Sequence, residues 1–255
     1  MPQRLELIPV EGFPRVQPGD NLAALIDVAL TANHLVLANS DVLVLAQKIV
    51  SKAEDRYVRL ASVTPGPEAI ELAGRADKDP RQVELILRES AEVVRVRPGV
   101  IIVEHRLGYV HANAGIDKSN IPNSEEDPQV LLLPLDSDAS AAKLREQLGA
   151  ITGVAPKILI NDSAGRAWRN GTVGIAIGTA GFDPLLNQIG ETDLFGNVLE
   201  VTEAAVADEL AAAASLVMGQ AAEACPLVLV RGAALSDSQD GSGALIRDKS
   251  MDMFR

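Results

Sequence analysis

Short apolar runs alternate with helical segments along this chain, and that alternation is the feature that most constrains its fold. Residues 5–9, 42–46 and 157–160 have the apolar character of buried strands. Between the first two, apolar residues recur at helical spacing from Asp20, a good N-cap, to about Ala32. The sequence contains no repeat of about 20–50 residues, which argues against a solenoid or a propeller. We therefore predict an α+β protein with mixed sheets and helices.

Local signals place further elements. Asp79 is a good N-cap, Pro80 suits the first helical position and Gln82 can complete a capping box, so we predict a helix over about 80–90. Residues 234–255 are rich in Ser, Asp and Gly, and we expect a loosely structured tail there, behind a domain formed by residues 1–233. The remaining predicted elements are strands at 100–104, 108–111 and 130–133, and helices at 137–148 and 202–222.

Charge and composition exclude several classes of partner. The chain has 35 acidic and 23 basic residues, a formal net charge of −12, so its overall field repels a nucleic-acid backbone. No apolar run approaches the roughly 20 residues that span a bilayer, and the N-terminus lacks the pattern of a signal peptide. The single cysteine, Cys225, excludes a disulfide framework. We expect a cytoplasmic protein that binds neither nucleic acid nor membranes.

Two polar loops are predicted directly after strands. The loop at 113–127 contains Asp117, and the loop at 161–171 contains Asp162 beside Ser163. Carboxylates accompanied by other oxygen donors suit Mg²⁺ or Mn²⁺, which proteins commonly bind together with substrate phosphates. Turns also favour Asp and Asn for purely conformational reasons, so spacing alone leaves both interpretations open.

Basic residues flank these loops. Phosphoryl transfer needs cations beside metal-binding carboxylates, although charged residues can equally form a solvated face. Trp168, the only tryptophan, could flank a planar ligand or simply pack against its neighbours. His34, His105 and His111 share no ligand spacing and are interpreted as structural or surface residues. Candidate contacts to substrate or phosphate are Arg166, Trp168 and Arg169, with Lys48, Lys52, Arg56 and Lys118 also near the loops.

Six segments in a fixed order carry a family resemblance. They are LELIPVEGFP at 5–14, AQKIVSKAE at 46–54, NAGIDKSN at 113–120, NDSAGR at 161–166, DLFG at 193–196, and VADELAAAA at 206–214 followed by MGQ at 218–220. Together they resemble the coenzyme F420-0:L-glutamate ligase family. The resemblance implies a GTP-dependent enzyme that adds L-glutamate to the deazaflavin coenzyme F420-0 through a γ-linked amide bond. It also implies two sites for Mg²⁺ or Mn²⁺, a role for K⁺, and an intertwined homodimer with a family-specific fold.

The same resemblance assigns roles to individual residues. It implies that Asp117 and Asp162 hold one metal ion and that Ser163 and Gln220 hold a second. Two positions depart from the family pattern, because Ser163 stands where threonine is common and Asp55 stands where glycine often follows Ala-Glu. The implied GTP contacts are Pro9, Val10, Glu11, Gly12, Gln47, Lys48, Lys52, Asn120, Met218 and Gly219, within a wider contact stretch at 216–223.

The chemistry of amide formation is consistent with this resemblance. A carboxylate does not condense with an amine at neutral pH until it carries a better leaving group than oxide. We therefore expect the acceptor carboxylate to attack the γ-phosphate of GTP, giving an acyl phosphate that the glutamate amine displaces. The alternatives are a metal-dependent GTP hydrolase, a non-catalytic subunit that binds a deazaflavin or nucleotide, and a ligase for an analogue of F420-0.

Overall fold

A five-stranded mixed sheet forms the centre of the molecule in the computed structural model, which describes residues 4–253. β2 and β8 pair in parallel, whereas the other neighbouring strands are antiparallel. This arrangement confirms the predicted α+β class with mixed sheets. The predicted homodimer and family-specific fold stay predictions. In spatial order the strands are β1 (Glu6–Pro9), β12 (Leu227–Arg231), β2 (Val42–Ala46), β8 (Lys157–Arg166) and β9 (Arg169–Ala180).

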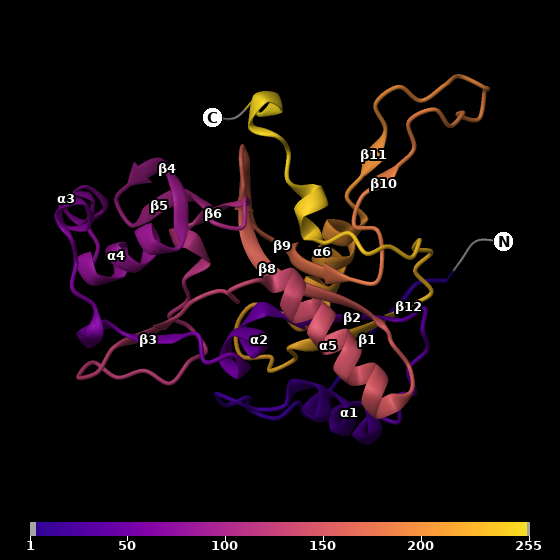
Figure 1. The fold of residues 1–255 in the computed structure, drawn as a ribbon, viewed down its shortest axis with the longest axis horizontal. Coiled ribbons are helices and arrows are strands. Elements are labelled where there is room, and N and C mark those ends of the chain that lie inside the picture. The colour runs from indigo at the N-terminus through magenta and orange to yellow at the C-terminus, as the bar shows by residue number, and fades with distance from the viewer. Residues whose placement is uncertain (1–3, 254–255) are drawn as a thin grey trace.

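Helices cover both faces of this sheet (Figure 1). In β2, Leu43 and Leu45 belong to a hydrophobic core shared with α1 and α5, while Val42 and Val44 belong to a core shared with α6. Side chains alternate between the two faces of a strand, so a strand covered on both sides is a continuous apolar run. The helices are α1 (Leu22–Ala32), α5 (Ser137–Thr152) and α6 (Val206–Met218).

A second hydrophobic core lies beside the sheet, on the left of Figure 1. Residues 57–132 build it as an insertion between α2 (Gln47–Ala53) and α5. The N-cap of α4 forms as predicted, because Asp79 accepts the Arg81 backbone N–H at 2.9 Å and Pro80 is the first helical residue. The elements are β3 (Tyr57–Arg59), α3 (Pro67–Ala76), α4 (Pro80–Arg88), β4 (Ser90–Arg97), β5 (Val100–His105), β6 (Val110–Ala112) and β7 (Gln129–Leu131).

Several predicted boundaries are wrong, and the N-cap of α1 is Asn21 rather than Asp20. The predicted polar loop at 161–171 is mostly strand, because β8 continues to Arg166 and β9 begins at Arg169 after a tight turn in which Trp168 has φ +63°. The alanine-rich helix starts at Val206 rather than Thr202, since β11 (Glu203–Ala204) first pairs with β10 (Leu186–Asn187). It ends at Met218 rather than near Ala222, where Gly219 takes φ +72°.

The C-terminal stretch after residue 233 makes specific contacts. Oδ1 of Asp237 lies 2.6 Å from Nζ of Lys157, and the Ser242 hydroxyl donates to the carbonyl oxygen of Ile177 at 3.0 Å. Lys249 forms an ion pair with a glutamate of β5. The division of the chain at residue 233 stays a prediction. Within residues 4–253, no helix is both long enough and apolar enough to cross a bilayer.

The packing of α6 on β9 depends on Gly174. A Cβ at this position would collide with Oγ of Ser215 and the carbonyl oxygen of Ala211, both on α6. We expect Gly174→Ala to lower the free energy of unfolding by about 1–3 kcal/mol, measured by urea denaturation. Gly165→Ala is the matched control, because a Cβ there meets no atom within 4 Å. Equal losses in the two variants would contradict the close approach of α6.

Candidate active site

Strand pairing brings four segments of the chain to one edge of the central sheet. The register of β2 and β8 sets Ala46 beside Asn161, so α2 begins next to the residues that follow Asn161. The Ala46 backbone N–H also donates to the carbonyl oxygen of Pro226 at 2.8 Å, which places the start of β12 at the same edge. β1 ends there as well, since Pro9 pairs with Val228. Residues far apart in sequence therefore meet at this edge.

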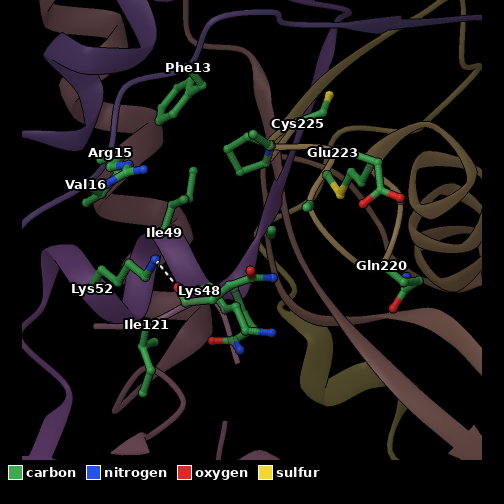
Figure 2. A pocket seen from close by; sticks show the side chains of 18 of the residues that line it. Phe13, Arg15, Val16, Lys48, Ile49, Lys52, Ile121, Gln220, Glu223 and Cys225 are labelled. Atoms are coloured by element: carbon green, nitrogen blue, oxygen red, sulfur yellow. Dashed lines mark hydrogen bonds between the residues drawn. The ribbon is translucent and has the colours of Figure 1, made fainter. Parts of the chain in front are cut away.

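A cavity of about 660 Å³ opens at this edge (Figure 2). Figure 2 shows Lys48 and Lys52 on one side and Gln220 with Glu223 on the other. A volume of this size is typical of small-molecule sites. The cavity is lined by residues 13–17, 46–49, 52, 57, 120–122, 161–163 and 218–226.

Asp117 lies behind the cavity wall and is held by two residues of α2. Its Oδ2 accepts the Gln47 Nε2–H at 2.6 Å and lies 3.1 Å from Nζ of Lys48. Gln47 is itself oriented by the Ser51 hydroxyl, which donates to its Oε1 at 2.9 Å. Burial raises the pKa of Asp117; the charge of Lys48 opposes this rise, and the negative charge of Asp162 adds to it. The two carboxylates are therefore close enough to destabilise one another's charge.

Asp162 lines the cavity and has a partner that the sequence analysis did not propose as a site residue. Nε2 of His111, on β6 of the second core, lies 3.1 Å from Oδ2 of Asp162. Burial lowers the pKa of His111, but its contact with Asp162 outweighs that effect, so the pKa is raised overall. The next residue, Ser163, donates its hydroxyl to Oε1 of Gln220 at 2.8 Å. Four predicted metal-binding residues thus lie at one edge of the sheet.

Cations gather on the side of the cavity formed by α2 and the segment after β1. Nζ of Lys52 donates to the carbonyl oxygen of Asn120 at 2.7 Å, as the dashed line from Lys52 in Figure 2 shows. The Asn120 side chain donates to the carbonyl oxygen of Ala221 at 3.0 Å. Burial lowers the pKa of Lys52, and the nearby positive charges of Lys48 and Arg15 lower it further. Three cations near one cavity of an acidic chain favour an anionic ligand. Arg15 is a cavity residue that the sequence analysis missed.

The donor set fits a hard divalent cation. Asp117, Asp162, Ser163 and Gln220 offer only oxygen atoms, and Mg²⁺ or Mn²⁺ prefers such ligands. Over residues 4–253, no three His, Cys, Asp or Glu side chains group together as a metal-binding cluster. A cation here therefore depends on the two carboxylates together with neutral oxygens, waters or substrate phosphates, which is how Mg²⁺ is usually bound. Such a cation would relieve the repulsion between the two carboxylates.

The predicted contacts at residues 9–12 lie just before the cavity lining. Pro9 ends β1, and the Val10 backbone N–H donates to the carbonyl oxygen of Leu227 at 3.0 Å, so this turn is fixed to the start of β12. The Glu11 backbone N–H donates to Oδ1 of Asn33 at 3.1 Å, and Gly12 takes φ +67°. The lining begins with the following residue, and contact of this turn with GTP stays a prediction.

The other predicted nucleotide and substrate residues divide into two groups. Met218 and Gly219 line the cavity. Arg166, Trp168 and Arg169 lie at or beside the turn between β8 and β9, outside the lining, and Trp168 is 87% exposed. Their contact with a substrate stays a prediction.

Comparison with known proteins decides the family. A family model described as F420-0:Gamma-glutamyl ligase matches residues 12–232. The chain belongs to the F420-0:gamma-glutamyl ligase family. This confirms the resemblance seen in the sequence and the prediction that the chain is a ligase.

Relatives in this family match the chain over nearly its whole length. The coenzyme F420:L-glutamate ligase of Methanothermobacter thermautotrophicus is 46% identical over 253 residues, covering 98% of this chain and 99% of that protein. The ligase of the same name from Methanopyrus kandleri is 44% identical, covering 99% of this chain and 97% of that protein. The ligase of the same name from Archaeoglobus fulgidus is 41% identical, covering 99% of this chain and 97% of that protein.

Asp55, one departure from the family pattern, has a structural explanation. It follows the end of α2 with φ +53°, a conformation that glycine adopts without strain and that Asp tolerates better than most residues. Asp55 therefore adopts the left-handed backbone conformation that this turn requires, and glycine is not needed there.

His105 is buried in an aromatic stack close to the site, and its protonation can be tested. The rings of His105 and Tyr109 stack at 4.9 Å, and Tyr109 meets His111 edge-on at 6.4 Å. Burial, helped by the positive charge of Arg106, lowers the pKa of His105 to about 4. Its Nδ1 accepts the Leu107 backbone N–H at 3.1 Å, which requires that nitrogen to carry no proton.

Protonation of His105 should therefore destabilise the folded chain. Below an unfolded pKa of about 6.5 the unfolded state binds more protons, so stability is lost as the pH falls toward 4. Between pH 7 and pH 4.5 we expect wild type to lose about 2–3 kcal/mol more unfolding free energy than His105→Leu. Urea titrations at both pH values measure this, and parallel losses would contradict a neutral, buried His105.

Proposed function

We propose that this chain catalyses the GTP-dependent addition of L-glutamate to coenzyme F420-0, forming an amide bond and releasing GDP and phosphate. The observation that carries the proposal is that Asp117 and Asp162, two neutral oxygen donors and three cations lie at, or directly behind, the lining of one cavity of about 660 Å³. Family membership and the names of the relatives support the deazaflavin and glutamate as substrates.

The cavity supports a nucleoside triphosphate as the activating substrate. Amide formation requires a leaving group on the acceptor carboxylate, and the γ-phosphate of GTP supplies one. Lys48 and Lys52 lie where they can neutralise a polyphosphate, with Arg15 beside them. The preference for GTP over other triphosphates rests on the family resemblance.

The proposed reaction has two steps. A carboxylate oxygen of F420-0 attacks the γ-phosphorus, the bond from that phosphorus to the bridging oxygen breaks, and GDP leaves. The amine nitrogen of glutamate then attacks the acyl carbon, phosphate leaves, and the nitrogen loses a proton. Throughout, Lys48 and Lys52 offset the charge on the phosphates, which lowers the barrier because these positive charges are in place before the reaction begins.

Two divalent cations belong to this proposal. Asp117 and Asp162 would hold one, and Ser163 with Gln220 would hold the second. Mg²⁺ or Mn²⁺ bound there supplies positive charge that stabilises the charge developing during phosphoryl transfer. A role for K⁺ rests on the family resemblance alone.

A homodimer also belongs to the proposal. The arm formed by β10, β11 and the residues between them projects from the molecule (Figure 1). Leu194 is 100% exposed and Phe195 is 90% exposed on this arm. Large apolar side chains gathered on a projecting segment support an interface with a second copy of the chain.

Mass spectrometry of the deazaflavin tests the function. After incubation with F420-0, L-glutamate, GTP and Mn²⁺ or Mg²⁺, we expect a mass gain of one or more glutamyl units, with GDP formed in parallel. Omitting GTP or metal should abolish the gain. Unchanged deazaflavin with accumulating GDP would instead indicate a hydrolase or a different acceptor, and no turnover would indicate a binding subunit.

Removing either carboxylate tests the cation site. Asp117→Asn and Asp162→Asn keep the side-chain shape but remove the charge, and we expect GDP formation to fall at least about a hundredfold in each. Asp127→Asn is the control, because Asp127 pairs with Arg59 on the surface and lies outside the cavity. Thermal melting checks that each variant folds. Retained turnover in either site variant would contradict the proposed cation site.

A further inference from the structure

The two site carboxylates belong to segments that pack on different hydrophobic cores. Asp162 lies on β8 of the central sheet, whereas Asp117 follows β6 in the inserted second core. Their separation therefore depends on contacts that cross between the cores. α2 supplies one such contact through Gln47 and Lys48, both of which hold Asp117. His111 supplies another, because it lies on β6 and reaches Asp162.

His111 is fixed on several sides. Its side chain is 8% exposed, and its Nδ1 lies 3.1 Å from the carbonyl oxygen of Ala112. Its ring meets the ring of Tyr109 edge-on, with the ring centroids 6.4 Å apart. These contacts leave the imidazole little freedom to rotate, so Nε2 is held toward Oδ2 of Asp162.

We propose that His111 is a positioning residue that orients the Asp162 carboxylate for cation binding. Nε2 of His111 lies against Oδ2, so Oδ1 can serve a cation in the cavity that Asp162 lines. Carboxylates that bind metals commonly form a hydrogen bond to a second side chain that does not touch the metal, and loss of that side chain weakens metal binding. This inference rests on the cation site of the proposed function.

The covalent path from His111 to Asp117 strengthens the assignment. Both residues belong to one short segment, β6 followed by a 3₁₀ turn (Asn113–Gly115), and the Asn113 side chain accepts the Ile101 backbone N–H at 3.1 Å. Asp117 is then fixed by a backbone pair with Leu131. One ordered segment thus presents a carboxylate to the site and holds the carboxylate of the other core.

Mn²⁺ binding by the 255-residue chain, measured without nucleotide and again with GDP, tests this role. The dissociation constant is measured at pH 7.5 from the electron paramagnetic resonance signal of free Mn²⁺. We expect His111→Leu to weaken Mn²⁺ binding about 10–100-fold. His111→Gln, whose amide N–H can reach Asp162, should recover most of the affinity. His105→Leu is the matched control, because it removes a neighbouring buried imidazole that does not touch the carboxylate pair, and it should stay within about threefold of wild type.

Each outcome decides between explanations. Wild-type affinity in His111→Leu, or equal losses in His111→Leu and His105→Leu, would overturn the positioning role while leaving the cation site intact. Failure of the wild-type chain to bind Mn²⁺ both without nucleotide and with GDP would overturn the cation site and this inference together. Thermal melting without Mn²⁺ checks folding. Should His111→Leu not fold, His111→Asn replaces it, because its amide is too short to reach Asp162.

Discussion

The parallel pairing of β2 with β8 is the constraint on which the rest of the structure depends. It sets Ala46 beside Asn161, and that register places α2 next to Asp162 and Ser163. A shift of one residue would turn every side chain of β8 to the other face of the sheet. The register is fixed because β2 and β8 are buried on both faces, between α1 and α5 on one side and α6 on the other.

Charge placement in the site follows from this geometry. The chain carries a net charge of −12, yet its cavity gathers Lys48, Lys52 and Arg15 within electrostatic range of one another. The carboxylates at the same edge repel each other, and burial adds to their cost. A site that gathers charge of both signs is well suited to an anion bound together with a cation.

Several elements could be predicted because their signals are local. The helix after Asp79 begins where the N-cap and Pro80 predict it, since both act on their own backbone. The segment at 161–171 could not be predicted as strand. Its polar residues match the composition of a loop, and only pairing with β9, where Asp162 lies opposite Ile175, satisfies its backbone in an extended form.

Local patterns and residue order were sufficient to predict the fold class and the family, and they carry the prediction of the site residues that the family's motifs contain. Only the packing of the folded chain brings His111 to Asp162 and Arg15 to the cavity. His111 precedes Asp162 by about fifty positions and lies in a different core, and Arg15 reaches the cavity from the segment after β1. No spacing rule connects such residues, since their proximity results from how the two cores pack and how the strands pair.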